Sequence, residues 1–180
     1  MIKTCVKSII KEVSMSDKVK VVVIDDEPDY CEYIKEKLEA IGEYEVTTTS
    51  APEQAEQVIR QVMPAIILLD IVMPTRKGTD VIAALKKTDD LKRIPIIVVT
   101  GKGEMVFNKK KHDFQWVPNS KIVQGRGPLP DARSAEALAE AYKANDYLAK
   151  PFAVDVLVEI MKDVLAKARK SAVKQEELGP

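Results

Sequence analysis

The fold of this chain is indicated by one short segment, Val21-Val-Val-Ile-Asp-Asp-Glu-Pro28. Its apolar half belongs to a run over 19–24 without polar alternation, which is typical of a strand buried on both faces of a parallel sheet. Two more runs of this kind cover 65–69 and 94–99. The three runs together predict three buried strands of one parallel sheet.

Helical spacing of apolar residues covers five further segments, and two shorter segments have strand character. The helical segments are 30–41, 53–62, 81–85, 131–145 and 154–165, and the strand-like segments are 46–49 and 147–149. Ser50-Ala-Pro-Glu53 has the form of a capping box with proline in the first turn, and it predicts the start of the second helix. Strands that alternate with helices predict an α/β domain with a parallel sheet, and five βα units are the simplest count.

The composition excludes several classes of protein. The chain has 180 residues, 46% of them hydrophobic, so it can fill one compact core and is not disordered throughout. Its 28 basic and 28 acidic residues argue against a dedicated nucleic-acid binder, which usually has a basic excess. Cys5 and Cys31 cannot form a disulfide framework, and no apolar run has the roughly 20 residues of a membrane span. We therefore expect a cytoplasmic protein that contacts neither nucleic acid nor membrane directly.

Polar side chains follow the predicted strands at the points where the strands end. Asp25 and Asp26 follow the first strand, Asp70 and Thr100 follow the next two buried strands, and Lys150 follows the last. In a doubly wound sheet, ligands bind outside the carboxyl ends of the strands. Three carboxylates would repel one another there unless a hard cation such as Mg²⁺ joined them. An added ammonium and hydroxyl group make the site suitable for the oxygens of a phosphoryl group.

Four motifs in this order resemble the receiver domain of bacterial response regulators. They are Val21-Val-Val-Ile-Asp-Asp-Glu-Pro28, Leu68-Leu-Asp-Ile-Val-Met-Pro74 with Gly78, Val98-Val-Thr100 and Asp146-Tyr-Leu-Ala-Lys-Pro-Phe152. The resemblance covers about 19–100 and 131–166. It implies a flavodoxin-like, doubly wound sheet of five parallel strands in the order 2-1-3-4-5, with helices on both faces.

The resemblance also implies how the acidic residues would act. Asp70 would be the phosphoacceptor and would receive a phosphoryl group from a phosphohistidine of a sensor histidine kinase or phosphotransfer protein. Asp26 and Asp70 would bind Mg²⁺ directly, together with the backbone carbonyl of Val72. Asp25 would act on the same cation largely through water.

Three more roles follow from the resemblance alone. Lys150 would pair with the phosphoryl group, and its peptide bond to Pro151 would be cis. Thr100 and Tyr147 match the switch pair of the family, in which the hydroxyl moves toward the phosphate and the aromatic ring turns inward. The chain would then catalyse only its own phosphorylation and dephosphorylation, and would not be an enzyme with an external substrate.

The predicted domain is flanked by two short extensions. We expect an N-terminal extension over 1–16, the receiver domain over 17–168 and a polar C-terminal tail over 169–180. No output domain is expected, so the chain would act through protein contacts with a downstream partner. The sequence leaves the oligomeric state open, including a homodimer.

One segment of about 103–130 has no sustained periodicity and is expected to be an insertion. Fifty residues separate Thr100 from Lys150, about twice the usual distance in the family that the chain resembles. The insertion places Phe107, Phe114 and Trp116 among basic residues. Our hypothesis is that it supplies a lid or an added partner surface.

Two other functions use the same residues. The first is a constitutive interaction module, in which the insertion keeps a receiver fold from switching. The second is a metal-dependent phosphatase or hydrolase, which would need a general acid or base beside its nucleophile. Asp70-Ile-Val72 has no carboxylate two positions after Asp70, and this disfavours the hydrolase.

Overall fold

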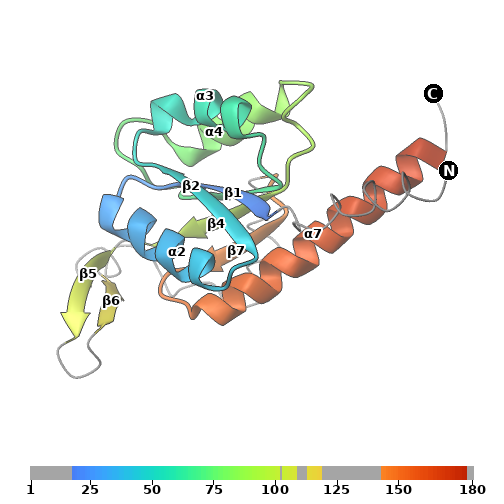
Figure 1. The fold of residues 1–180 in the computed structure, drawn as a ribbon. Helices are drawn as coiled ribbons and strands as arrows, with labels where there is room; N and C mark the ends of the chain where they lie inside the picture. Colours follow the sequence, from blue (N-terminus) through green and yellow to red (C-terminus); the bar gives the residue numbers. More distant parts are fainter. Residues whose placement is uncertain (1–17, 102, 109–112, 119–142, 178–180) are drawn as a thin grey trace, which may run out of the picture.

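The computed structural model describes residues 18–101, 103–108, 113–118 and 143–177, and its centre is a parallel sheet (Figure 1). The strands of this sheet are β1 (Val19–Ile24), β2 (Tyr44–Thr49), β3 (Ile66–Leu69), β4 (Ile96–Thr100) and β7 (Asp146–Ala149). They are ordered β2-β1-β3-β4-β7, and every neighbouring pair is parallel. Because β7 is the fifth strand of this sheet, the predicted order 2-1-3-4-5 is confirmed.

Helices cover both faces of the sheet (Figure 1). One face carries α2 (Pro28–Ala40) and α7 (Val154–Glu177), and the other carries the 3₁₀ turn η1 (Pro52–Gln54), α3 (Ala55–Val62) and α4 (Gly78–Lys86). The helix predicted over 131–145 lies mostly outside the described residues, as do 1–16 and the insertion residues 109–112 and 119–130. The last helix runs to Glu177, beyond the expected end of the domain at 168.

The core is divided into two layers by the sheet. Along β1, Val21 and Val23 belong to the layer under α2 and α7, whereas Val22 and Ile24 belong to the layer under α3 and α4. Successive side chains of a strand point to opposite faces, so a strand buried on both faces has to be apolar at every position. This explains the apolar runs that predicted the strands.

The predicted capping box at Ser50 is wrong. Ala51 is the N-terminal cap of the turn Pro52–Gln54, and no side chain caps it. The Ala51 N–H instead donates to Thr49 Oγ1 at 3.2 Å. The Thr49 hydroxyl therefore closes a local turn at the end of β2, and the chain enters α3 through a 3₁₀ turn.

The insertion contains regular structure that its irregular pattern did not predict. β5 (Gly103–Asn108) and β6 (Asp113–Pro118) form a two-stranded antiparallel sheet beside the N-terminal end of α2 (Figure 1). The register pairs Met105 with Trp116 and Phe107 with Phe114. Such residues favour strands, but six residues are too few for a clear period.

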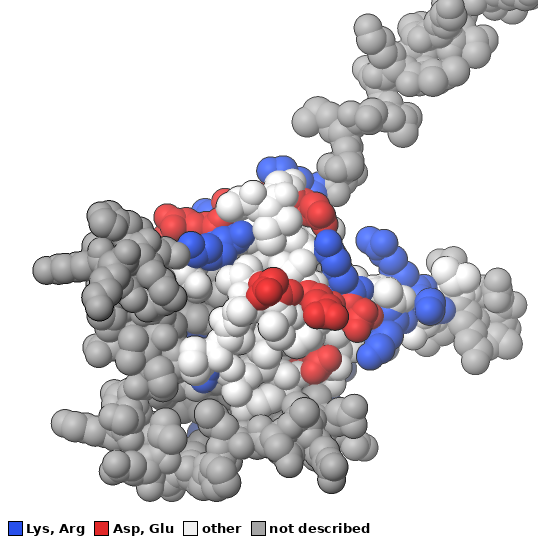
Figure 2. All heavy atoms as spheres, turned by 90° about the horizontal axis from the view of Figure 1, so that it is seen from below, with Lys and Arg blue, Asp and Glu red and all other residues white. Residues whose placement is uncertain are grey.

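The surface of the described residues mixes both signs of charge on the face seen from below. Figure 2 shows acidic and basic side chains next to one another on this face, with uncharged surface between them. None of the helices in the described part of the chain is both long and apolar enough to cross a bilayer.

Candidate functional site

Three carboxylates converge at the carboxyl end of the sheet. Asp25 and Asp26 directly follow β1, and Asp70 directly follows β3. β1 and β3 are neighbours whose last residues, Ile24 and Leu69, are paired. One oxygen atom of each carboxylate lies within 4.8 Å of the others. The three side chains thus lie together, as the sequence predicted.

Backbone hydrogen bonds hold the carboxylates in place. The Asp70 N–H donates to the Ile24 carbonyl at 2.9 Å, which ties the two loops together. The Val72 N–H donates to Asp70 Oδ1 at 3.1 Å, and the Glu27 N–H donates to Asp25 Oδ1 at the same distance. Each carboxylate thus closes a turn with the amide two residues later. The bond from the Val72 N–H also brings the backbone of Val72 to the Asp70 carboxylate.

Lys150 reaches the same cluster from β7. Its Nζ forms a hydrogen-bonded ion pair with Asp25 Oδ2 and lies 3.9 Å from Glu27 Oε2. The Lys150 side chain is fully buried. Its peptide bond to Pro151 is cis, as the sequence resemblance implied. In this structure the ammonium group is therefore bound by Asp25, whose carboxylate lies close to that of Asp70, the residue that the resemblance implies is the phosphoacceptor.

Burial dominates the electrostatics of the site. It raises the pKa of Asp25 to about 7, with Lys150 acting against this rise and Asp70 adding to it. Burial also raises the pKa of Tyr30 and that of the Cys31 thiol, the latter to about 12. Cys31 is accordingly a protonated core thiol and not a nucleophile at neutral pH.

The donor set fits a hard divalent cation. Asp25 and Asp70 are almost completely buried, and Asp26 is partly exposed. Buried carboxylates at this separation disfavour one another's charge, and a cation between them removes this cost. Carboxylate and carbonyl oxygens with room for water on one side are typical ligands of Mg²⁺.

The two predicted switch residues lie on the neighbouring strands. Thr100 is the last residue of β4 and is paired with Ala149, the residue before Lys150, so its backbone is at the edge that carries the acidic cluster. Tyr147 is partly buried and packs against the core layer of α3 and α4. The structure thus brings five of the predicted residues and the Val72 backbone to one edge, with Tyr147 further back in β7.

Three residues of the site were not predicted to have their observed contacts. Glu27 lies near the Lys150 ammonium, and the ring of Tyr30 lies beneath it. Gly78, the first residue of α4, packs directly on the Asp70 backbone. Gly78 belongs to the Asp70 motif in the sequence, but the motif does not show its contact with the Asp70 backbone. No sequence signal links Tyr30 with a lysine 120 positions away.

The fold and the site define a doubly wound α/β protein with an acidic cluster at the carboxyl end of its sheet. The family model for the response regulator receiver domain matches residues 21–114. The chain belongs to this family, the receiver domains of two-component systems.

Individual relatives agree with this assignment. The chain is 38% identical to a probable transcriptional regulator ycf27 of Pyropia yezoensis over 50% of this chain and 35% of that protein. It is 30% identical to the phosphate regulon transcriptional regulatory protein PhoB of Pseudomonas aeruginosa over 82% of this chain and 52% of that protein. The chain thus spans a third to a half of the length of these two relatives.

Solved structures show the same fold. A putative response regulator from Chloroflexus aurantiacus is 25% identical, with a TM-score of 0.60 over 83% of this chain and 99% of that one. A Francisella response regulator receiver domain is 21% identical, with a TM-score of 0.60 over 83% of this chain and 98% of that one.

Proposed function

We propose that this chain is a phosphorylation-dependent signalling switch whose phosphoacceptor is Asp70. The observation that carries the proposal is the convergence of Asp25, Asp26 and Asp70, with a buried lysine bound to the cluster. The phosphoryl donor is a phosphohistidine of a sensor histidine kinase or phosphotransfer protein. The chain has no external substrate, and its output is a changed protein-binding surface.

The transfer uses the residues of the cluster in distinct ways. A carboxylate oxygen of Asp70 attacks phosphorus, a P–O bond forms, and the P–N bond to the donor histidine breaks with its electron pair going to the imidazole. Bound Mg²⁺ supplies positive charge for the phosphoryl oxygens. Asp26, Asp70 and the Val72 carbonyl would hold this cation, and Asp25 would act on it largely through water.

Lys150 and Thr100 complete the charge balance around the transferred group. The Lys150 ammonium is already desolvated at Asp25, so it can turn to a phosphoryl oxygen without first leaving bulk water. The Thr100 hydroxyl binds a second phosphoryl oxygen, and the Tyr147 ring follows this movement inward. Phosphorylation then shifts the populations of two pre-existing states of the binding surface.

A constitutive interaction module remains the second candidate. The observation that favours it is the β5–β6 sheet, which directly follows β4 in the chain. Switching would require the segment after Thr100 to move, and an ordered sheet there would oppose this movement. The main proposal takes 17–168 as the receiver domain, from which the last helix continues to Glu177, and it includes no direct binding of nucleic acid.

A phosphoryl analogue separates the two candidates. Titration of the wild-type chain with beryllofluoride and Mg²⁺ is expected to shift amide resonances around Asp70, Thr100 and Tyr147, because the analogue occupies the place of the phosphoryl group. Beryllofluoride without Mg²⁺ is the control and should change little. Amide spectra unaffected by the complete mixture would support the constitutive module.

The affinity for Mg²⁺ is expected to rise with pH. Because the pKa of Asp25 is raised to about 7, its carboxyl group is mostly protonated at pH 6 and mostly ionised at pH 8. Binding favours the ionised form, so the association constant should increase about tenfold between these pH values. Calorimetric Mg²⁺ titrations at both values measure this change.

Two variants test the origin of this pH dependence. Asp25→Asn should bind Mg²⁺ more weakly and with little dependence on pH, because the titrating group has been removed. Asp89→Asn, at an exposed position, should retain the wild-type dependence. Equal affinities of the wild type at pH 6 and pH 8 would show that Asp25 is not the controlling group.

A further inference from the structure

The Lys150 ammonium has an aromatic contact in addition to its ion pair with Asp25. Lys150 Nζ lies over the ring of Tyr30, 3.6 Å from the ring centroid. Lys150 is buried, so water does not compete for the ammonium. A cation over an aromatic face interacts most strongly when it is desolvated. The ring of Tyr30 is therefore a substantial part of the surroundings of this cation.

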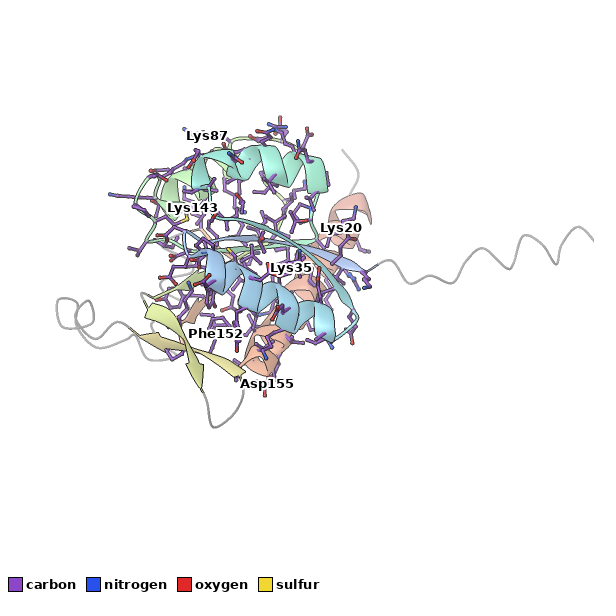
Figure 3. All side chains as sticks on the ribbon, turned by 60° about the vertical axis from the view of Figure 1, so that its left-hand side comes forward. Lys20, Lys35, Lys87, Lys143, Phe152 and Asp155 are labelled. Carbon is purple, nitrogen blue, oxygen red and sulfur yellow. The ribbon has the colours of Figure 1, made fainter. Side chains whose placement is uncertain are left out.

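The ring is itself held firmly by other aromatic groups. Tyr30 is 3% exposed, and its ring packs edge-on against Phe152, with the ring centroids 6.5 Å apart. The ring of Tyr33 lies at a tilt of 36° to it, with the centroids 6.4 Å apart. Phe152 lies between α2 and the beginning of α7 (Figure 3). Because Phe152 follows Lys150 by two residues, the segment that carries the ammonium also packs against the ring beneath it.

The interaction is made by the ring and not by the hydroxyl group. Among the described residues, the Tyr30 hydroxyl has no hydrogen-bond partner. Tyr30 lines a small cavity that also touches Asp25, Asp70 and Phe152. The ring thus lies between the core layer of α2 and the carboxylates, with its face toward the lysine.

We propose that Tyr30 is a positioning residue for Lys150: its ring face keeps the ammonium beside the carboxylate cluster, where it can reach the phosphoryl group on Asp70. The inference rests on the proposed function, because it assigns Lys150 a role in phosphoryl transfer. The other groups that the described residues place near the ammonium, Asp25 and Glu27, are carboxylates that attract it by charge. The ring supplies a fixed surface, so it limits where the ammonium can go when Asp25 releases it.

The first test compares ring-retaining and ring-removing variants at position 30. Tyr30→Phe keeps the face of the ring, and Tyr30→Leu removes it. With saturating Mg²⁺, labelling by acetyl phosphate should be about tenfold slower in Tyr30→Leu and within about twofold of wild type in Tyr30→Phe, since 1.4 kcal/mol corresponds to a factor of ten. Calorimetric Mg²⁺ affinity should be nearly unchanged in both, because Tyr30 provides no metal ligand.

A matched control separates positioning from core packing. Tyr44 is buried in the same core layer but lies at the start of β2, at the opposite end of the sheet. Tyr44→Leu makes the same change in volume and should label at the wild-type rate, although it also lowers stability. Equal rates for Tyr30→Leu and wild type would overturn the proposal, and so would a Tyr30→Phe variant as slow as Tyr30→Leu.

A spectroscopic measurement tests the contact independently of phosphorylation. Protons on the Lys150 Cε should show an upfield ring-current shift that is retained in Tyr30→Phe and lost in Tyr30→Leu. Should Tyr30→Leu fail to fold, Tyr30→pentafluorophenylalanine keeps the shape of the ring, reverses its quadrupole and should also slow labelling. Absence of labelling in the wild type contradicts the proposed function. A missing wild-type ring-current shift contradicts the positioning role.

Discussion

Replacing Asp70 by Asn is expected to abolish labelling of the chain by acetyl phosphate, with a loss of at least about a hundredfold in rate. The amide has nearly the same shape, and its oxygen can still accept the hydrogen bond from the Val72 N–H. An amide is not a nucleophile for phosphorus, however, and it lacks the charge that attracts the cation. The variant should therefore keep the fold while losing the chemistry.

The Asp70→Asn change should not lower the stability of the protein, although it removes the labelling. Asp70 contributes to the raised pKa of Asp25, so its charge is unfavourable near this buried neighbour when no cation is bound. Without Mg²⁺ the Asn variant is expected to be as stable as wild type or slightly more stable, because one buried charge has been removed. Urea unfolding in EDTA measures this difference.

An exposed carboxylate provides the control for labelling. Asp89→Asn changes a residue outside the cluster and should be labelled at the wild-type rate. Digestion of the labelled wild type should place the phosphoryl group on the peptide that contains Asp70. Persistent labelling of the Asp70→Asn variant at another residue would contradict the assignment of the phosphoacceptor.

Replacing Gly78 by Ala is expected to destabilise the protein by about 3 kcal/mol, at the upper end of what overpacking costs. A Cβ atom at this position would overlap the carbonyl oxygen of Asp70 and lie 2.8 Å from the Ile71 Cα. These neighbours are backbone atoms, so they cannot turn away as a side chain could. The Gly78 N–H also donates to the Ile71 carbonyl at 3.1 Å, which holds the loop against α4.

The same change should slow phosphorylation. The Asp70 loop has to move to admit the new methyl group, and the three carboxylates then lose part of their mutual alignment. The free energy of unfolding in urea and the rate of labelling by acetyl phosphate are the two measurements, and both should fall. Wild-type labelling in a destabilised Gly78→Ala variant would show that the loop tolerates the displacement.

Gly42→Ala is the matched control for this prediction. Gly42 has a φ of +85°, so alanine is strained there, but no heavy atom lies within 4 Å of the added Cβ. The expected cost is about 1 kcal/mol, from backbone strain alone. Because Gly42 lies before β2, at the far end of the sheet from the site, labelling should not change. A larger loss of stability from Gly42→Ala than from Gly78→Ala would contradict the steric explanation.

The acidic cluster was predictable because of the regular geometry of parallel sheets. Buried strands are apolar at every position, so 19–24 and 65–69 could be recognised without a structure. Neighbouring parallel strands end at the same edge, and carboxylates directly after them have to lie close together. The resemblance to the family implied that these two strands are neighbours, and the observed meeting of Asp25, Asp26 and Asp70 agrees with it.

Local details depended on which short-range hydrogen bonds the folded chain forms. Ser50 has the sequence of a capping residue, but Thr49 closes the turn and the helix begins through a 3₁₀ segment. The strands β5 and β6 depend on pairing with each other, and their pattern alone was too short to show it.

The sequence alone was therefore sufficient for the parallel α/β fold and for the residues at its carboxyl edge, since these follow from the period of the hydrophobic pattern and from strand ends. The order of the strands in the sheet came from the family resemblance. Only the folded chain shows that Lys150 pairs with Asp25 over the Tyr30 ring, and that Gly78 leaves space for the Asp70 backbone. These contacts join residues far apart in the chain and depend on side-chain packing at separations of a few ångströms. A pattern of residue types does not contain such distances, because they result from how all the layers of the core fit together.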